Sequence, residues 1–298
     1  MSILLTKNTA VLIQGITGKE GQKAAAAMQE YNTKICAGVT PGKSGQFVAG
    51  CPVFNSIAEA MSHAPHINVS AIYVPPFAAK TAILEAIENN IPLINVITER
   101  IPLRDTAYCL AAAREKNIRL LGPSSLGLIS PGIGRIGMVG GPRELAEQIF
   151  KPGSVGIISR SGGMTNEISW QVRRASLGQS TAVHVGGDLL MGTTYADLLQ
   201  LFEQDDQTKA VVIFGEHGGS YEWEIIKLLN DRLFTKPLAI YIGGKFAKVL
   251  PEGMSIGHAG AIVERGRGAT EKTEALARVG VHVAEHYEDL PKLIKPYL

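Results

Sequence analysis

Cysteine is scarce and scattered in this 298-residue chain. The three cysteines, Cys36, Cys51 and Cys109, are an odd number, which argues against a disulfide framework, and no Cys or His spacing typical of a metal site is present. No apolar run reaches membrane-spanning length, and the first residues lack the apolar core of a secretory signal peptide. We therefore expect a reducing compartment, the bacterial cytoplasm or, for a processed chain, the mitochondrial matrix.

An excess of charge of either sign is also missing. The 29 Lys and Arg residues nearly balance the 27 Asp and Glu residues, for a net charge of +2. This balance predicts neither a nucleic-acid nor a membrane-surface partner, although a few placed lysines suffice to bind anionic small molecules. Apolar residues make up 45% of the chain, enough for a sizeable core in one large domain or two ordinary ones.

Short β-rich runs alternate with longer helical stretches along most of the chain. The first series predicts strands over 10–14, 34–39, 69–74, 93–96 and 119–121, and helices over 19–31, 57–63, 78–89 and 105–116. A glycine- and proline-rich stretch over 122–153 breaks the rhythm. The second series predicts strands over 154–159, 181–185, 210–214, 238–242 and 281–283, and helices over 164–176, 195–202, 222–232, 271–279 and 290–298. This order predicts two α/β domains with parallel sheets covered on both faces, and a boundary between 125 and 150.

A single histidine stands among glycines near the end of the second series. His258 lies within Met-Ser-Ile-Gly-His-Ala-Gly-Ala-Ile, residues 254–262. Glycine permits backbone angles and close approach that a Cβ would forbid, and a buried structural histidine seldom needs glycine on both sides. We therefore expect His258 to be the chemical centre of the chain.

A glycine-rich turn follows the first predicted strand and opens the first helix. In Gly15–Gly21, backbone N–H groups and the helix dipole would favour a phosphate. The spacing is G-x-x-G-x-x-G, neither the dinucleotide fingerprint nor the NTP phosphate loop, and a turn without a ligand remains open on these residues alone. Lys43 follows the second strand and is well placed to pair with a phosphate. The acidic residue that would hold an NAD ribose is missing there, which favours another phosphorylated ligand.

A second turn of this type opens the helix predicted in the second series. Ser161, Gly162 and Gly163 follow a strand, so the first helical N–H groups could hold an anion. Ser159 and Ser161 lie outside any G-x-S-x-G motif, which disfavours a hydrolase. Glu216 ends the next strong strand of this half.

Several motifs taken together resemble the α subunit of succinyl-CoA synthetase (succinate–CoA ligase), of the nucleotide-diphosphate-forming acyl-CoA synthetase superfamily. They are Thr40–Lys43, Ile72–Pro75, Ile97–Pro102 and the segment around His258, and the similarity runs over the whole chain. The resemblance implies a Rossmann-like CoA-binding domain over 1–125. It implies a flavodoxin-like, parallel-sheet ligase domain over 126–298 that carries a phosphorylated histidine.

The same resemblance assigns roles to individual residues. The implied CoA-binding residues are Thr17, Gly18, Lys19, Glu20, Lys43, Tyr73, Pro75, Ile97, Thr98 and Glu99. The implied substrate- or phosphate-binding residues are Ser161, Gly162, Gly163, Thr165 and Asn166. Glu216 is expected to hold one imidazole nitrogen of His258, which leaves the other nitrogen as the nucleophile. His217, where the family commonly has an apolar residue, is expected to support the neighbouring site residues or the fold and not to compete as a phosphate carrier.

The implied activity is ATP- or GTP-dependent ligation of an acid to coenzyme A, as in the succinate step of the tricarboxylic acid cycle. The acid is activated as an acyl phosphate, His258 carries the phosphoryl group, and the CoA thiol attacks the acyl carbonyl. The chain has no Walker A motif and no segment resembling an ATP-grasp domain. We therefore expect a separate ATP-grasp β subunit, in an αβ or α2β2 heteromer, to bind most of the nucleotide and its Mg²⁺.

Two departures from the family pattern bear on the acid. Residues 122–127 read Gly-Pro-Ser-Ser-Leu-Gly where Gly-Pro-Asn-Cys-Pro-Gly is usual, and residues 162–167 read Gly-Gly-Met-Thr-Asn-Glu where Gly-Thr-Leu-Thr-Tyr-Glu is usual. The second form is similar to ATP-citrate lyase and citryl-CoA synthetase. Asn166 in place of tyrosine leaves room and adds an amide, which suits a larger or hydroxylated acid such as citrate or malate as an alternative to succinate.

Two other classes of protein compete with the ligase. An NAD-dependent oxidoreductase rests only on the glycines after the first strand. A non-catalytic CoA-sensing protein would have no use for His258 and Glu216.

Overall fold

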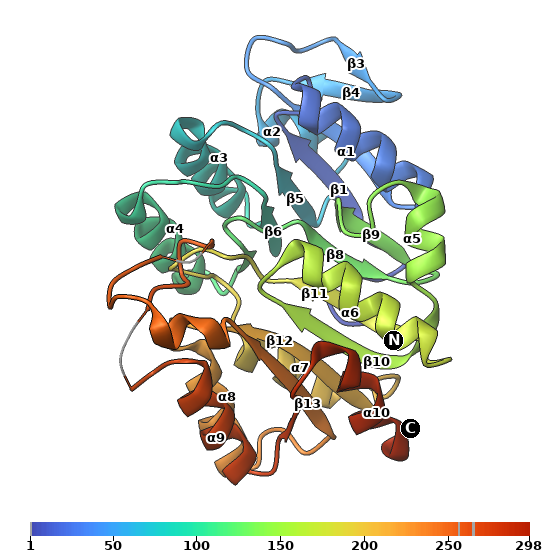
Figure 1. Ribbon diagram of the computed structural model, residues 1–298. Helices are drawn as coiled ribbons and strands as arrows, with labels where there is room; N and C mark the ends of the chain where they lie inside the picture. Colours follow the sequence, from blue (N-terminus) through green and yellow to red (C-terminus); the bar gives the residue numbers. More distant parts are fainter. Residues whose placement is uncertain (1, 256, 264–265) are drawn as a thin grey trace.

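Every residue of strand β1 (Ala10–Gln14) is buried, because its alternate side chains enter different layers of the molecule. The computed structural model describes residues 2–255, 257–263 and 266–298 (Figure 1). Val11 and Ile13 pack with the helix that follows β1, whereas Leu12 packs with the helices of the opposite face. Burial on both faces explains why the predicted strands read as continuous apolar runs.

The first sheet is built from the first 121 residues. Its strands are β1, β2 (Lys34–Val39), β3 (Phe47–Val48), β4 (Cys51–Phe54), β5 (Val69–Ile72), β6 (Leu93–Val96) and β7 (Arg119–Leu121). Its helices are α1 (Lys19–Glu30), α2 (Ile57–His63), α3 (Pro76–Glu88) and α4 (Leu103–Glu115). The order β3-β4-β2-β1-β5-β6-β7 contains the 3-2-1-4-5-6 arrangement of Rossmann folds, with β3 added antiparallel at the edge. The short strands β3 and β4 were not predicted.

The second sheet is formed by the rest of the chain. Its strands are β8 (Gly127–Ser130), β9 (Gly134–Gly137), β10 (Pro152–Ser159), β11 (Gln179–His184), β12 (Ala210–Glu216), β13 (Leu238–Gly243) and β14 (His282–Val283). Its helices are α5 (Arg143–Ile149), α6 (Gly162–Arg174), α7 (Tyr195–Gln204), α8 (Tyr221–Asn230), α9 (Ala269–Arg278) and α10 (Leu290–Ile294), with 3-10 turns at Lys245–Val249, Tyr287–Asp289 and Lys295–Tyr297. The order β11-β10-β12-β13-β14 is the flavodoxin arrangement 2-1-3-4-5, as expected.

The glycine-rich stretch 122–153 is more regular than its sequence predicts. It contains the antiparallel hairpin β8–β9 and helix α5, so the second sheet is not parallel throughout. The two strands approach so closely that a Cβ on Gly127 would lie 1.9 Å from the carbonyl oxygen of Ile136. Glycine is therefore needed here for packing, whereas in the sequence it reads as a break.

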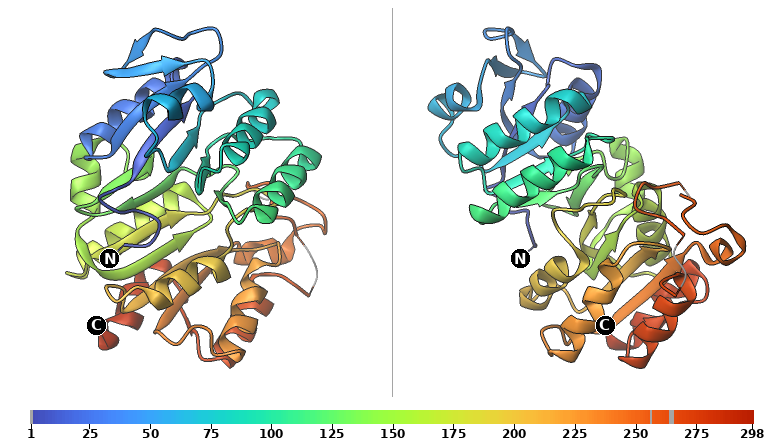
Figure 2. Two further views of the ribbon diagram at one scale, coloured as in Figure 1. Left: turned by 180° about the vertical axis from the view of Figure 1, so that it is seen from behind. Right: turned by 90° about the vertical axis from the view of Figure 1, so that its left-hand side faces the viewer.

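The two sheets are joined through this hairpin. Arg135 of β9 is fully buried, and its Nε donates a hydrogen bond to the carbonyl oxygen of Ala27 in α1 at 3.0 Å. Thr33 donates to the carbonyl oxygen of Arg135 at 2.6 Å. Figure 2 shows the two α/β units packed against each other. The chain leaves the first sheet at Leu121 and enters the second at Gly127, which supports the domain boundary that we propose between 125 and 126.

Each sheet has a point where neighbouring strands send their connections to opposite sides. These points lie between β1 and β5, and between β10 and β12. Ligands of open α/β sheets bind at the carboxyl ends of such strands. Among the described residues, no helix is long and apolar enough to cross a bilayer.

Candidate active site

His258 and Glu216 form a close pair at the carboxyl end of β12. The Nδ1 atom of His258 lies 2.6 Å from Oε1 of Glu216. The hydrogen bond to Glu216 raises the pKa of His258, against the opposing effects of partial burial and the nearby Arg160. When the ring is neutral, donation from Nδ1 leaves Nε2 unprotonated and able to act as a nucleophile. The structure thus brings together the two residues that were predicted to act as a pair; Ile256 of the same segment lies outside the described residues.

A buried ion pair holds the backbone of Glu216. Lys272 in α9 and Glu222 in α8 are both fully buried at the side chain, and Lys272 Nζ lies 2.7 Å from Glu222 Oε2. Lys272 also donates to the carbonyl oxygens of Glu216, at 2.8 Å, and of Gly218. Glu222 Oε1 accepts a hydrogen bond from the backbone N–H of Glu216 at 3.1 Å. The sequence offered no signal for this arrangement, because the two residues lie 50 positions apart.

Arg160 places a buried positive charge beside the same carboxylate. Its Nε atom lies 3.9 Å from Oε2 of Glu216, and Nη2 donates to the carbonyl oxygen of Asp188 at 2.8 Å. The guanidinium lies over the ring of Tyr221 at 5.7 Å. A Cβ on Gly260 would lie 2.2 Å from Nη2, so the glycine after Ala259 gives this guanidinium its space. Sequence reasoning missed Arg160.

Helix α6 begins beside the histidine. Ser161 is its N-cap, and the hydroxyl accepts a hydrogen bond from the N–H of Met164 at 3.4 Å. Ser161, Gly162 and Gly163 all line the cavity that contains His258. The free N–H groups of the first turn and the helix dipole make this end suitable for an anion.

The other two residues of the predicted substrate group lie elsewhere. The Thr165 hydroxyl is buried and donates to the carbonyl oxygen of Ser161 at 2.8 Å. Asn166 accepts a hydrogen bond from the N–H of Gly140 at 3.0 Å and lines a separate groove with Trp170. The expectation that Asn166 enlarges the acid site therefore has no support in this arrangement.

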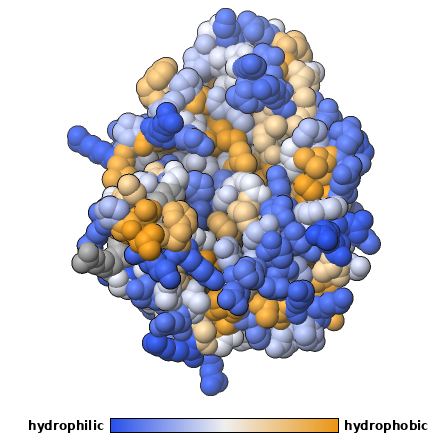
Figure 3. All heavy atoms as spheres, in the orientation of Figure 1, coloured by the Kyte–Doolittle hydropathy of each residue, from blue (hydrophilic) through white to orange (hydrophobic). Residues whose placement is uncertain are grey.

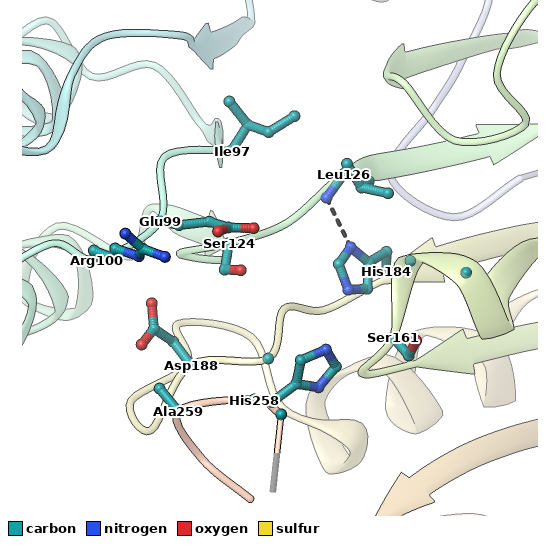
Figure 4. A pocket seen from close by; sticks show the side chains of 14 residues that line it. Ile97, Glu99, Arg100, Ser124, Leu126, Ser161, His184, Asp188, His258 and Ala259 are labelled. Carbon is teal, nitrogen blue, oxygen red and sulfur yellow. Dashed lines mark hydrogen bonds between the residues drawn. The ribbon is translucent and has the colours of Figure 1, made fainter. Parts of the chain in front are cut away.

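The cavity around His258 has a volume of about 470 Å³ and receives side chains from both sheets (Figure 4). Its lining residues are Ile97, Glu99, Arg100, Ser124, Leu126, Ser161, Gly162, Gly163, His184, Gly187, Asp188, Gly257, His258 and Ala259. A Cβ on Gly187 would lie 2.7 Å from Cγ of His258, so the imidazole rests directly on this backbone. The pair Gly186-Gly187 after a strand was a signal that sequence analysis did not use.

A second histidine in the cavity wall is held neutral. His184 accepts a hydrogen bond at Nδ1 from the N–H of Leu126 at 2.7 Å, and its Nε2 lies 2.9 Å from the carbonyl oxygen of Arg160, to which it donates. Burial lowers its pKa to about 4. Because both ring nitrogens are occupied, His184 supports the wall and does not compete with His258. His217 does not line this cavity, and its Nδ1 accepts a hydrogen bond from the N–H of Ala269 at the start of α9.

The residues expected to bind CoA phosphates lie at the carboxyl edge of the first sheet. Thr17 Oγ1 lies 3.2 Å from Thr40 Oγ1, which joins the two predicted phosphate loops. Gly15 has φ +81°, and a Cβ there would lie 2.6 Å from the carbonyl oxygen of Tyr73, so the turns after β1 and β5 touch. Of the residues expected to bind CoA, the exposed ones are Gly18, Lys19, Glu20, Lys43 and Pro75.

The remaining expected CoA residues divide by environment. The hydroxyl of Tyr73 is buried without a hydrogen-bond partner in the described part of the chain, and burial raises its pKa. Thr98 donates to the carbonyl oxygen of Val74 at 2.7 Å, so its hydroxyl supports the loop. Ile97 and Glu99 line the His258 cavity. The predicted set thus extends from the exposed edge of the first sheet to the cavity that contains His258.

The described residues contain no group of three or more His, Cys, Asp or Glu side chains placed to hold a metal ion.

Comparison with known proteins matches both halves of the chain. Residues 6–100 match the family model described as CoA binding domain, and residues 158–282 match that of CoA-ligase. The chain is 42% identical over 300 residues to the succinate–CoA ligase [ADP-forming] subunit alpha 2 of Archaeoglobus fulgidus, covering all of both chains. It is 40% identical over 299 residues to the ADP-forming sulfoacetate–CoA ligase subunit SauD of Bilophila wadsworthia, again covering all of both.

A solved structure shows the same arrangement. An ATP citrate lyase from Methanothrix soehngenii, in complex with citrate and coenzyme A, superposes with a TM-score of 0.91 at 28% identity. The match covers 99% of this chain and 50% of that longer one. With a CoA-binding domain followed by a CoA-ligase domain and full-length identities of 40–44%, the chain belongs to the family of ADP-forming succinate–CoA ligase α subunits and their relatives.

Proposed function

We propose that this chain is the α-type subunit of a nucleotide-dependent acid–CoA ligase in which His258 carries the phosphoryl group. The observation that supports this most directly is the 2.6 Å contact between His258 Nδ1 and Glu216, in a cavity bordered by the start of α6. The contact would leave Nε2 as the nucleophile, and the first residues of α6 line the same cavity, which supports a role of their N–H groups in stabilising a phosphoryl group.

The proposed reaction has three transfers. Nε2 of His258 attacks the γ-phosphorus of ATP or GTP, and the nucleoside diphosphate leaves. A carboxylate oxygen of the acid then attacks the phosphorus, the P–N bond breaks, and an acyl phosphate forms. Finally the CoA sulfur, having lost its proton, attacks the acyl carbonyl, the C–S bond forms, and inorganic phosphate leaves. Splitting the reaction in this way replaces one difficult step by easier ones.

The nucleotide and its Mg²⁺ are assigned to a partner. The sequence lacks an NTP phosphate loop, and the relatives named above are subunits of ligases. We propose an ATP-grasp β subunit, in an αβ or α2β2 heteromer. Large apolar side chains near His258 in sequence support a docking face: Phe246, Val249 and Met254 are 61%, 77% and 45% exposed. Figure 3 shows apolar side chains, in orange, gathered on the left of the molecule in this view.

The acid is proposed to be a short carboxylic acid, with succinate and sulfoacetate as the first candidates because these are the acids in the names of full-length relatives. Citrate is a further candidate through the likeness to ATP citrate lyase.

Phosphoryl labelling tests the central proposal. The chain is co-purified with its partner subunit and incubated with γ-labelled ATP and Mg²⁺. We expect label on this chain in the wild type and none in His258→Asn. His63→Asn is a matched control, because His63 is an exposed histidine of α2 outside the cavity. Label retained by His258→Asn would overturn the assignment.

A further inference from the structure

Arg100 brings a positive charge into the cavity from the side of the first sheet. It follows Ile97 and Glu99 in the loop after β6, and all three line the same space as His258 (Figure 4). Among the described lining residues, Arg100 is the sole lysine or arginine. Its guanidinium forms neither an ion pair nor a side-chain hydrogen bond with another residue in the described part of the chain. The charge is therefore available to a ligand.

The backbone of Arg100 has a conformation that favours glycine. Its φ is +59°, in the left-handed region that side chains with a Cβ seldom adopt. Ser124, the other non-glycine lining residue with positive φ, has φ +60°. Residues held in this way cluster at ligand sites, where the surrounding structure maintains them.

An acid with two anionic groups could be held at two points of this cavity. Its reacting carboxylate must reach Nε2 of His258, because the phosphoryl group passes between these two groups. A second anionic group on the acid would be attracted by a cation in the same space, where the carboxyl side chains of Glu99 and Asp188 would repel it. The planar guanidinium offers paired N–H donors that match a carboxylate or a sulfonate.

We propose that Arg100 binds the second anionic group of the acid and makes the ligase select short acids with two anionic groups over acids with one. This inference rests on the proposed function, since it places the reacting carboxylate at His258. CoA phosphates and inorganic phosphate are other anions that an arginine could bind. The implied phosphate loops for CoA lie at Thr17–Glu20 and Lys43, and the test separates these ligands.

Steady-state kinetics of the ligase with its partner subunit test the inference. The variants are Arg100→Gly and Arg100→Asn, which both tolerate positive φ, and Arg100→Lys. We expect KM for succinate and sulfoacetate to rise by about 10- to 100-fold in the first two, with a smaller rise for lysine. The kcat/KM for propionate should not fall, and labelling of His258 by ATP should be unchanged. Arg232→Gly is a matched control: Arg232 is an exposed arginine with φ +54° at the end of α8.

The outcomes separate this inference from the proposed function. An unchanged preference for the two-anion acids over propionate would overturn it, as would a rise confined to KM for CoA or, in the reverse reaction, for phosphate. Wild-type enzyme that is labelled but prefers propionate would overturn it and leave the phosphohistidine intact. Absence of label in the wild type would instead contradict the proposed function.

Discussion

The ammonium group of Lys272 lies 2.8 Å from the backbone carbonyl oxygen of Glu216 and 2.7 Å from the carboxylate of Glu222, which in turn accepts from the N–H of Glu216. The buried pair thus binds both the backbone N–H and the backbone carbonyl oxygen of Glu216. Because Glu216 contacts His258, α8 and α9 determine where the imidazole is held. This couples the packing of the second domain to its chemistry.

Breaking this pair should cost both stability and labelling. Lys272→Met leaves the carboxylate of Glu222 buried without its partner, so we expect the free energy of unfolding to fall by about 3–5 kcal/mol, measured by urea denaturation. Arg143→Met is the control, since the Arg143–Glu147 pair is about half exposed at each side chain and should contribute less than about 1 kcal/mol.

The double variant Lys272→Met/Glu222→Met distinguishes the pair's role in positioning Glu216 from its contribution to the stability of the fold. It removes both buried charges, so part of the lost stability should return. Labelling of His258 should remain low, because neither the carbonyl nor the N–H of Glu216 is held. Labelling that recovers together with stability would refute a positioning role.

A methyl group at position 187 should displace the imidazole. The added Cβ of Gly187→Ala would lie 2.7 Å from Cγ of His258. We expect labelling to fall at least tenfold and the melting temperature to fall by a few degrees. In a His258→Ala background the same substitution should cost less stability, because the clashing ring is gone. An equal loss in both backgrounds would place the strain elsewhere.

Labelling should depend on pH through His258. Its pKa is raised, mainly by Glu216, and only the neutral ring is nucleophilic, so the rate should rise as pH increases through that raised value. Glu216→Gln removes the main cause, so the midpoint should move to lower pH while the plateau rate falls because the ring is less well oriented. Rapid-quench labelling across pH 5–9 measures both. A midpoint that does not move would mean that another group titrates.

His184 should make the fold less stable in mild acid. Its pKa is lowered from 6.5 to about 4, so from pH 6.5 downward the unfolded chain binds a proton that the folded chain refuses until about pH 4. This destabilisation should reach about 3 kcal/mol across that window. His184→Gln should flatten the dependence of the unfolding free energy on pH relative to wild type. Parallel curves for the two proteins would show that carboxylates cause the acid sensitivity.

Much of the fold could be predicted because local patterns and tertiary packing agree. The strands over 10–14, 34–39, 93–96 and 119–121 and the helix over 57–63 have the predicted limits. The predicted strand over 69–74 ends early, at Ile72, since Pro75 and Pro76 start the next helix. Strands β3, β4, β8 and β9 were missed because they are short and take part in hairpins at sheet edges, where pairing with neighbours outweighs a weak local signal.

Some features of the candidate site could also be predicted from the sequence, and others could not. Glycines next to His258, after strands and at helix starts led us to predict anion sites there, because glycine allows the tight turns and close approach that such sites require. Thr165 and Asn166 belong to the same motif but point away from the cavity, because successive positions of a helix face different directions.

The sequence by itself determined the two α/β units, the two glycine-rich helix starts, and the histidine with its carboxylate as chemical candidates. These features follow from short-range rules of backbone geometry and periodicity. Only the tertiary structure decided that Lys272, Glu222 and Arg160 hold Glu216, and that Arg100 enters the cavity of His258 from the other domain. These arrangements bring together residues that are far apart in the sequence, and no local pattern encodes a proximity that only the packing of the two sheets creates.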